Sequence, residues 1–240
     1  MTENVQNKLA DALKQAQTVT VLTGAGISAG SGLATFRDAQ TGLWAHFRPE
    51  DLATPEAFAR DPELVWRWYA WRRTLADTAA PNPAHTALME LAKRVPRFTL
   101  ITQNVDSLHQ RAGSVNVIEL HGSLRRARCE VEGTTQDWEP SQIPPRCVSC
   151  GQMLRPDIVW FGESLPEAAL HAAMKAATDC DLFLSIGTSG IVHPAASLIG
   201  RAAQNGATIA TINLEVKDYS SMGRYQIQGN AEEVLPQLLV

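Results

Sequence analysis

The chain has 240 residues, of which 45% are hydrophobic and 19% are charged, and its formal net charge is -4. This length and composition fit one compact domain or one domain with a smaller insertion. No block of Lys or Arg provides the electrostatic footprint of a nucleic-acid-binding protein. No apolar run approaches the roughly 18 residues that suggest a membrane-spanning helix. The composition therefore favours a soluble protein and argues against nucleic acid or membrane as a partner.

The N-terminal segment predicts a helix rather than a targeting signal. It is polar and contains Glu3 and Asp11, unlike a signal or transit peptide. The chain has 4 cysteines, too few for a disulfide scaffold. We therefore expect a cytoplasmic protein. The apolar residues that recur at helical spacing near the N-terminus are Val5, Leu9, Ala12, Leu13 and Ala16.

Short β-rich runs alternate with helical runs along much of the remaining chain. Strands are predicted at residues 18–22, 98–101, 115–120, 181–186 and 207–212. Helices are predicted at residues 84–94, 105–112, 166–177, 194–203 and 231–239. This alternation predicts an α/β fold, in which βαβ units build a mainly parallel sheet flanked by helices.

Two stretches interrupt the alternation. Residues 39–81 lack a clear strand but contain helical patches rich in Trp, and residues 125–156 are rich in Pro, Gly and Cys. We expect both insertions to form a smaller module over the mouth of the sheet. The larger part of this single domain then comprises residues 1–38, 82–124 and 157–240.

Polar fragments follow three of the predicted strands, at residues 23–28, 102–106 and 121–122, and the first and third of them contain glycine. In an open α/β sheet, ligands bind outside the carboxyl ends of the strands, so these fragments can converge on one ligand. The glycines let the backbone approach a pyrophosphate closely. The pattern predicts an enzyme that consumes a dinucleotide. Side chains suited to the chemistry are Asn104, Asp106 and His121.

Residues 24–29 fit the dinucleotide fingerprint G-x-G-x-x-A after a strand. That fingerprint also requires an acidic residue about 20 positions later, at a strand end, to hold the ribose hydroxyls. Here the corresponding region, residues 44–50, lies in a segment without a predicted strand. This departure argues against an ordinary dehydrogenase. Taken alone, the motif is equally compatible with a glycine turn that joins a strand to a helix.

The order of motifs along the chain resembles the sirtuins, a family of NAD-dependent protein lysine deacylases. The resemblance covers residues 23–239 and implies a Rossmann-like sheet that binds NAD under a small module with a zinc-ribbon-like insertion. The motifs are GAGISAGSGLATFRD, TQNVDSLHQRAG, HGS, a Cys cluster, PDIVWFGE, GTS and INLE.

The resemblance also implies a reaction. The carbonyl oxygen of acyl-lysine attacks C1′ of the nicotinamide ribose, nicotinamide leaves, and an imidate forms. A histidine then acts as general base on a ribose hydroxyl, which leads to free lysine and O-acyl-ADP-ribose. His121 matches that histidine. Imidazole suits the role because its unperturbed pKa, about 6.5, lies near working pH.

Asn104 and Asp106 match positions that hold the ribose and carboxamide of the nicotinamide nucleotide. An amide both donates and accepts hydrogen bonds, whereas a carboxylate accepts them. The alternative role is capping of the helix at residues 105–112, and both roles can coexist. The positions that the resemblance assigns to the cofactor are Gly24, Ala25, Gly26, Ser28, Phe36, Arg37, Trp44, Gln103, Asn104, Val105, Asp106, Gly187, Thr188, Ser189, Asn213, Leu214, Glu215 and Ala231.

The Cys cluster departs from the family pattern, which places two C-x-x-C pairs around a tetrahedral zinc. The pair Cys147 and Cys150 is intact, but Cys129 is followed by Glu132 where the second cysteine belongs. Zinc also accepts a carboxylate oxygen. The alternatives are Glu132 as fourth ligand, water as fourth ligand, or a module that has lost its metal. Clustered cysteines in a cytosolic chain favour a retained, structural zinc.

Tyr69 and Arg72 point the same way if their segment is a helix, because residues three apart share a face. A Tyr-x-x-Arg pair grips the distal carboxylate in the sirtuin branch that prefers succinyl- or malonyl-lysine. Residues 51–55 also resemble that branch, with Ala53 leaving room for the acyl chain. The alternative is that Tyr69 packs on tryptophans while Arg72, like Arg73, is solvated. We expect preference for succinyl, malonyl or glutaryl groups, with some activity on acetyl-lysine.

Two other functions are compatible with an NAD site: mono-ADP-ribosyl transfer and non-catalytic NAD sensing. The intact His121 argues against the sensor, since binding alone needs no base there. The expected partners are acyl-lysine proteins or peptides, bound through backbone pairing in a groove. Gly162 and Glu163 match part of the strand-like wall on which family substrates dock.

Overall fold

The structure is a computed structural model that describes residues 2–33, 46–215 and 225–239. Strands of the main sheet follow the order β3-β2-β1-β7-β8-β9, and every neighbouring pair is parallel. Strands that follow β1 in the sequence are added first on one side of it (β2, β3) and then on the other (β7, β8, β9), so the switch point of the sheet lies between β1 and β7. Doubly wound folds bind dinucleotides at such a switch point. The predicted Rossmann-like parallel sheet is confirmed. Its strands are β1 (Thr18–Thr23), β2 (Arg97–Thr102), β3 (Ile118–Glu119), β7 (Leu182–Ile186), β8 (Thr208–Asn213) and β9 (Tyr225–Gln228).

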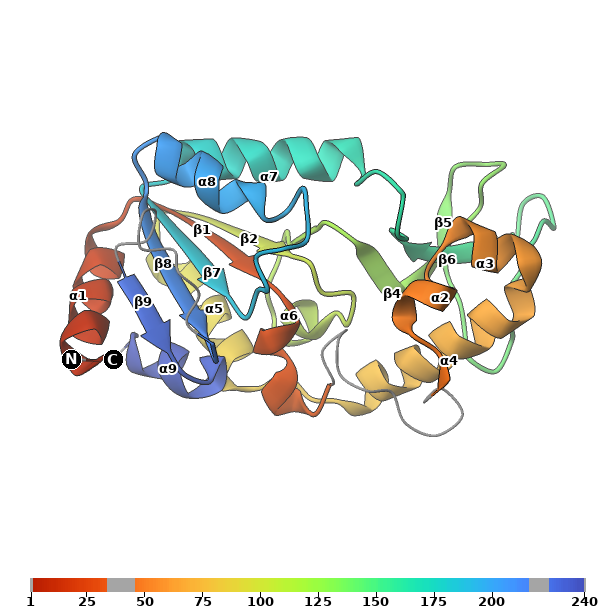
Figure 1. Cartoon of the computed structure of the whole chain (residues 1–240), viewed down its shortest axis with the longest axis horizontal. Helices are drawn as coiled ribbons and strands as arrows, with labels where there is room; N and C mark the ends of the chain where they lie inside the picture. Colours follow the sequence, from red (N-terminus) through yellow and green to blue (C-terminus); the bar gives the residue numbers. More distant parts are fainter. Residues whose placement is uncertain (1, 34–45, 216–224, 240) are drawn as a thin grey trace.

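Helices cover both faces of this sheet (Figure 1). Along β7, Leu184 and Ile186 join the core under one helix layer, whereas Phe183 joins the core under the other. Because side chains alternate along a strand, β7 is apolar toward both layers. One layer holds α1 (Thr2–Gln15), α5 (Pro83–Arg94) and α9 (Ala231–Gln237), and the other α7 (Glu167–Asp179) and α8 (Ser197–Gln204).

A smaller antiparallel sheet, in the order β5-β4-β6, lies at the other end of the molecule (Figure 1). The helices beside it begin at residues suited to capping: the side chain of Thr54 accepts from Ala57 N–H, and that of Asp61 accepts from Leu64 N–H. The elements are β4 (Gly122–Arg128), β5 (Thr135–Asp137), β6 (Arg155–Ile158), α2 (Pro49–Leu52), α3 (Pro55–Arg60) and α4 (Pro62–Thr78).

The strands β4, β5, β6 and β9 are not among the predicted elements. The sequence of β4 contains three arginines, which hide the apolar pattern of a strand. In the structure, carboxylates compensate the charge of one of these arginines. Arg126 donates to Asp157 at 2.8 Å and to Glu119 at 2.7 Å. In β9, only Tyr225 and Ile227 are buried, which is too short an apolar pattern to identify a strand.

Two predicted elements have half of their predicted length or less in the structure. The predicted helix at residues 105–112 is reduced to α6 (Leu108–Arg111). Ser107 has a φ of 61°, which is not compatible with a right-handed helix, so the helix begins only after this residue. The predicted strand at residues 115–120 is reduced to β3, since Asn116 has a φ of 54°. The glycine turn after β1 leads into 3₁₀ turns at Ala25–Ile27 and Ala29–Ser31 instead of an α-helix.

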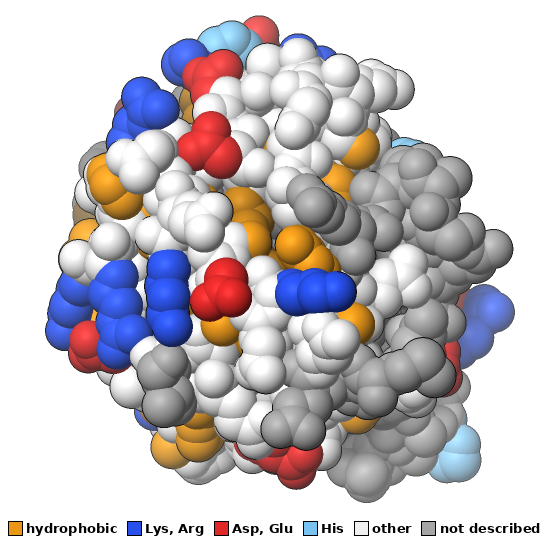
Figure 2. Space-filling view, turned by 90° about the vertical axis from the view of Figure 1, so that its left-hand side faces the viewer, with side chains coloured by type: hydrophobic (Ala, Val, Ile, Leu, Met, Phe, Trp, Pro, Cys, Tyr) orange, Lys and Arg blue, Asp and Glu red, His pale blue; other side chains and the backbone are white. Residues whose placement is uncertain are grey.

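The end of the molecule formed by α1, β9 and α9 has a mixed surface. Figure 2 shows basic and acidic side chains interspersed there, with hydrophobic side chains in separate small patches among the described residues. Such scattered apolar atoms are ordinary on a protein surface. In the described ranges, no helix has both the length and the apolar character needed to cross a bilayer.

Candidate active site and metal centre

Two of the predicted polar fragments, after β1 and β2, meet next to the switch point of the main sheet, and the third, after β3, joins them through the contact of His121 with Gln103 O. Gly24 N–H, directly after β1, donates to Ile186 O at 3.0 Å, at the end of β7. On the other side, Gln103 N–H donates to Thr23 O at 3.0 Å. The glycine turn therefore lies between the ends of β2 and β7, where a dinucleotide can cross the sheet.

Glycines allow the two loops at this point to touch. Gly26 N–H donates to Gly187 O at 3.0 Å, and a Cβ on Gly26 would lie 2.7 Å from Gly187 Cα. Gly187 has a φ of 61°, and its own Cβ would lie 2.4 Å from Ile27 N. Any side chain here would push the loops apart, so both positions require glycine.

Asn104 and Asp106 are tied to the glycine turn. The Ser28 hydroxyl, 2% exposed, donates to Asp106 Oδ2 at 2.8 Å, and Asn104 Nδ2 donates to Ser28 Oγ and Gly24 O at 3.2 Å each. Asp106 Oδ1 also accepts from Leu108 N–H at 2.9 Å, so the capping role is present. Burial raises the pKa of Asp106, although these two hydrogen bonds oppose the shift.

Two histidines below this cluster were not identified from the sequence. His85 Nε2 lies 3.5 Å from Ser28 Oγ, His109 Nε2 lies 2.9 Å from Thr23 Oγ1, and the two rings are 4.9 Å apart. Burial lowers the pKa of His85 to about 4 and that of His109 to about 3, so both are neutral. The available signal was weak: Asn82 and His85 form the capping box of α5.

His121 has one ring nitrogen fixed by the backbone. Its Nδ1 lies 3.0 Å from Gln103 O, and since a carbonyl only accepts, Nδ1 carries the hydrogen and Nε2 keeps a lone pair. Burial lowers the pKa of His121, which favours the neutral ring. His121 O accepts from Val159 N–H at 3.0 Å, and Gly122, with a φ of 83°, leaves room for Asp157 O. The residue is thus half-buried and oriented.

The β7 and β8 ends extend the site beyond Gly187. Asn213 Nδ2 donates to Thr188 O at 2.7 Å, and Thr188 Oγ1 lies 2.7 Å from Ser185 Oγ. The remaining assigned residues in the described part are Ala25 in the first 3₁₀ turn, Val105 after β2, Ser189 after β7, Leu214 and Glu215 after β8, and Ala231 at the start of α9. Phe36, Arg37 and Trp44 lie outside the described residues.

Tyr69 and Arg72 both lie on α4, within a cluster of aromatic rings. Tyr69 is 0% exposed, and its hydroxyl oxygen accepts from Trp160 Nε1 at 2.9 Å. Arg72 Cζ lies 4.9 Å from the ring centroid of Trp68 and 5.8 Å from that of Tyr69. Burial raises the pKa of Tyr69 to about 12. Burial lowers the pKa of Arg72, and the nearby charges of Tyr69 and Asp106 oppose this shift. The charges of Arg72 and Asp106 therefore attract one another.

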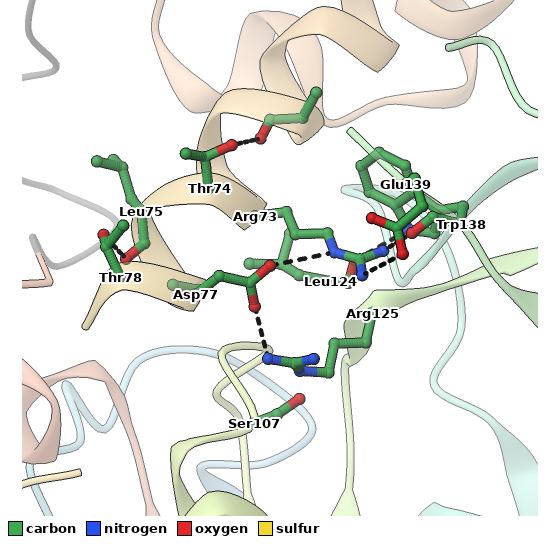
Figure 3. Close-up of polar contacts among 12 residues, drawn as sticks. Arg73, Thr74, Leu75, Asp77, Thr78, Ser107, Leu124, Arg125, Trp138 and Glu139 are labelled. Atoms are coloured by element: carbon green, nitrogen blue, oxygen red, sulfur yellow. Dashed lines mark hydrogen bonds and ion pairs between the residues drawn. The ribbon is translucent and has the colours of Figure 1, made fainter. Parts of the chain in front are cut away.

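Arg73 is buried, so the expectation that it is solvated is wrong. Its side chain is 7% exposed, Nε lies 3.5 Å from Asp77, and Nη1 donates to the carbonyl of Trp138 (Figure 3). Asp77 also pairs with Arg125 at 2.5 Å. Consecutive helical residues lie about 100° apart, so Arg72 and Arg73 face different sides of α4. Arg73 anchors α4 on the antiparallel sheet.

The comparison with known families decides the assignment. The sequence model of the Sir2 family matches residues 24–194. This chain belongs to the Sir2 family. A protein from Methylococcus capsulatus named NAD-dependent protein deacylase is 49% identical, over 97% of this chain and 95% of the relative.

Solved sirtuin structures agree with this assignment. A crystal structure of a Sir2 homologue in complex with NAD has a TM-score of 0.91 and 46% identity, and the match covers 97% of this chain and 91% of that one. A sirtuin bound to a myristoylated histone peptide has a TM-score of 0.78 and 36% identity, and covers 99% and 95% of the two chains.

The three clustered cysteines come together beside β4, as expected of a sirtuin zinc module. Cys129, Cys147 and Cys150 have sulfur atoms within 4.8 Å of one another, and the Cys129–Cys150 Sγ distance is 3.6 Å. Two thiolates on a tetrahedral zinc, each about 2.3 Å from it, are about 3.8 Å apart. Backbone N–H groups, foremost that of Cys150, lower the pKa of Cys147 to about 7 and favour its thiolate. The donor set fits zinc.

Glu132 is exposed, and among the described residues the group of metal-ligating atoms comprises only the three thiols. The backbone N–H of Glu132 donates to Cys129 Sγ at 3.4 Å instead. The Glu132 carboxylate therefore lies outside the thiol cluster. Cys180 lies apart from the cluster, in the core under α7 and α8.

Proposed function

We propose that this chain is an NAD-dependent protein lysine deacylase. The observation that carries the proposal is the orientation of His121, whose Nε2 is left with a free lone pair beside Gln103, at the end of β2. A sensor needs no base at this position, whereas deacylation does. The relatives named NAD-dependent protein deacylase, at 49% and 50% identity over nearly the whole chain, support the same activity.

The residues have distinct roles in this proposal. NAD supplies the electrophilic C1′ that the acyl oxygen attacks as nicotinamide departs. Gly24, Gly26 and Gly187 let the backbone approach the pyrophosphate. Asn104 and Asp106 orient the nicotinamide ribose and carboxamide, with Ser28 holding both side chains in place. His121 Nε2 then takes a proton from a ribose hydroxyl.

The remaining cofactor assignments belong to the same proposal. Thr188, Ser189 and Asn213 face the ribose and phosphates on the adenosine side, where loop backbone N–H groups can bind them. Ala231 lies at the adenine. The other residues that we place around the cofactor are Ala25, Phe36, Arg37, Trp44, Gln103, Val105, Leu214 and Glu215.

We assign Tyr69 and Arg72 to the acyl group and propose a preference for succinyl, malonyl or glutaryl chains over acetyl, as in the desuccinylase-like branch of the family. Tyr69 lies in the apolar core of the smaller module with the Arg72 guanidinium over its ring, and a phenol and a guanidinium can both donate to a carboxylate. Gly162 and Glu163 then belong to the wall on which an acyl-lysine peptide docks.

We also propose that the protein is cytoplasmic, because clustered free thiols persist in reducing compartments.

Products distinguish this function from its rivals. The protein is incubated with NAD and one peptide carrying succinyl- or acetyl-lysine, and the products are identified by mass spectrometry. We expect nicotinamide, free lysine and O-acyl-ADP-ribose from both peptides. A peptide that gains ADP-ribose would instead indicate mono-ADP-ribosyl transfer, and unchanged NAD would indicate a sensor.

We further propose that Cys129, Cys147 and Cys150 hold a structural zinc. Protein purified without chelator is expected to contain about one zinc per chain, and metal removal should lower its melting temperature, since structural zinc contributes folding free energy. Glu132→Cys should slow zinc transfer to a chromophoric chelator, because a fourth thiolate replaces a weaker ligand. Cys180→Ser is the matched control and should leave zinc content unchanged. Metal-free protein of equal melting temperature would contradict a zinc site.

A further inference from the structure

Trp160 connects the proposed acyl-binding pair to the wall on which the peptide docks. Its Nε1 donates to the Tyr69 hydroxyl at 2.9 Å, and the two side chains are 3% and 0% exposed. An indole N–H can only donate, so the phenol oxygen has to accept this hydrogen bond. The phenol hydrogen is then directed away from Trp160 and remains available to an acceptor elsewhere.

The indole cannot easily turn away from Tyr69. The guanidinium of Arg155 is stacked on it, with Cζ 3.6 Å from the ring centroid. Arg155 is held in turn by two hydrogen bonds to the Glu163 carboxylate, at 2.7 and 2.8 Å. Glu163 also accepts from the backbone N–H of Trp160 at 2.9 Å, and Phe58 packs on the indole at 5.2 Å between centroids.

The backbone on either side of Trp160 is fixed to the catalytic region. Val159 N–H donates to His121 O at 3.0 Å, and Phe161 N–H donates to Ala53 O at 2.9 Å. One short segment therefore contacts the base, the segment proposed to shape the acyl pocket and, through its indole, Tyr69. Trp160 occupies a position from which it can influence acyl choice without touching the acyl group.

We infer that Trp160 is a positioning residue for acyl selectivity, which commits the Tyr69 hydroxyl to act as a donor toward the acyl group. This inference rests on the proposed function of Tyr69 and Arg72. Arg72 offers only donors, and with Trp160 in place Tyr69 offers a donor as well. A pocket end that presents only donors favours a group that only accepts, which is an ionised carboxylate.

The test compares kcat/KM for succinyl- and acetyl-lysine versions of one peptide in Trp160→Phe. Phenylalanine keeps an aromatic ring on Arg155 but has no N–H, so the Tyr69 hydroxyl is free to rotate. We expect the succinyl-to-acetyl ratio to fall by roughly 2- to 10-fold, the range for one neutral hydrogen bond. In a Tyr69→Phe background, Trp160→Phe should change the ratio no further.

Trp66→Phe is the matched control, since Trp66 is another buried indole in the same core, whose Nε1 donates to Leu154 O at 3.0 Å. It should lower the melting temperature but leave the ratio unchanged. An equal loss of turnover on both peptides in Trp160→Phe, or an additive effect in the double variant, would overturn the inference.

A second measurement needs no substrate. The chain has 3 tyrosines, so the ¹³Cζ signal of Tyr69 in labelled protein can be assigned by its loss in Tyr69→Phe. Trp160→Phe should shift this signal, and an unshifted signal would refute the hydrogen bond. A wild-type enzyme without acidic-acyl preference overturns the assignment of Tyr69 and Arg72, and the selectivity role with it. A preserved preference with an unchanged ratio in Trp160→Phe overturns the role of Trp160 alone.

Discussion

Replacement of His121 by alanine is expected to lower net deacylation by about 10²- to 10⁴-fold, the usual contribution of a general base. The structure leaves Nε2 without a hydrogen, because Nδ1 donates to Gln103 O. Burial keeps the ring neutral by lowering its pKa, so the base is present at neutral pH. NAD binding, measured by calorimetry, should change little, since the backbone at Gly24, Gly26 and Gly187 that we assign to the pyrophosphate is unaltered.

The position of His121 in the reaction sequence can be tested separately. Exchange of labelled nicotinamide into NAD depends on cleavage at C1′, which precedes the base-dependent step. Exchange should therefore survive better than net deacylation in His121→Ala. His171→Ala, an exposed histidine on α7, serves as control and should retain both activities. Product formation near the wild-type rate in His121→Ala would remove this residue from the mechanism.

The parts of the site that could be predicted from the sequence are those with a local cause. A glycine turn after a buried strand, and polar residues after two others, signal a ligand at the strand ends whatever the rest of the fold does. The structure brings the ends of these strands together, with Gln103 N–H bonded to Thr23 O and His121 Nδ1 bonded to Gln103 O.

The parts that could not be predicted depend on contacts between distant segments. His85 supports Ser28 only because α5 packs against the turn after β1, and nothing near His85 in the sequence indicates this contact. In the sequence, Arg73 cannot be distinguished from a surface arginine. It is buried because its guanidinium lies over the ring of Trp138, which is distant in the sequence. The strand β4 is similar: Arg126 is acceptable there because Glu119 and Asp157 converge on it from two other segments.

Arg72→Met is expected to lower desuccinylation by roughly 10- to 100-fold in kcat/KM. A carboxylate that enters the apolar core of the smaller module loses its water, and an unpaired charge there is costly. Arg72 offsets this cost with charge-assisted hydrogen bonds, each contributing about 1.5–3 kcal/mol, where about 1.4 kcal/mol corresponds to tenfold. Acetyl-lysine carries no carboxylate, so its turnover should stay unchanged or rise as the pocket becomes less polar.

Arg67→Met is the matched control on the same helix, because Arg67 is exposed and pairs with Glu63 at the surface. It should leave both substrates unaffected, since exposed ion pairs contribute little. Tyr69→Phe should move selectivity in the same direction as Arg72→Met, but less, because it removes one neutral donor rather than a charge. Equal losses on succinyl- and acetyl-lysine in Arg72→Met would mean that Arg72 maintains the fold or the Asp106 region instead. The assignment of an acidic acyl group would then be wrong, while the deacylase proposal, which depends on His121, would stand.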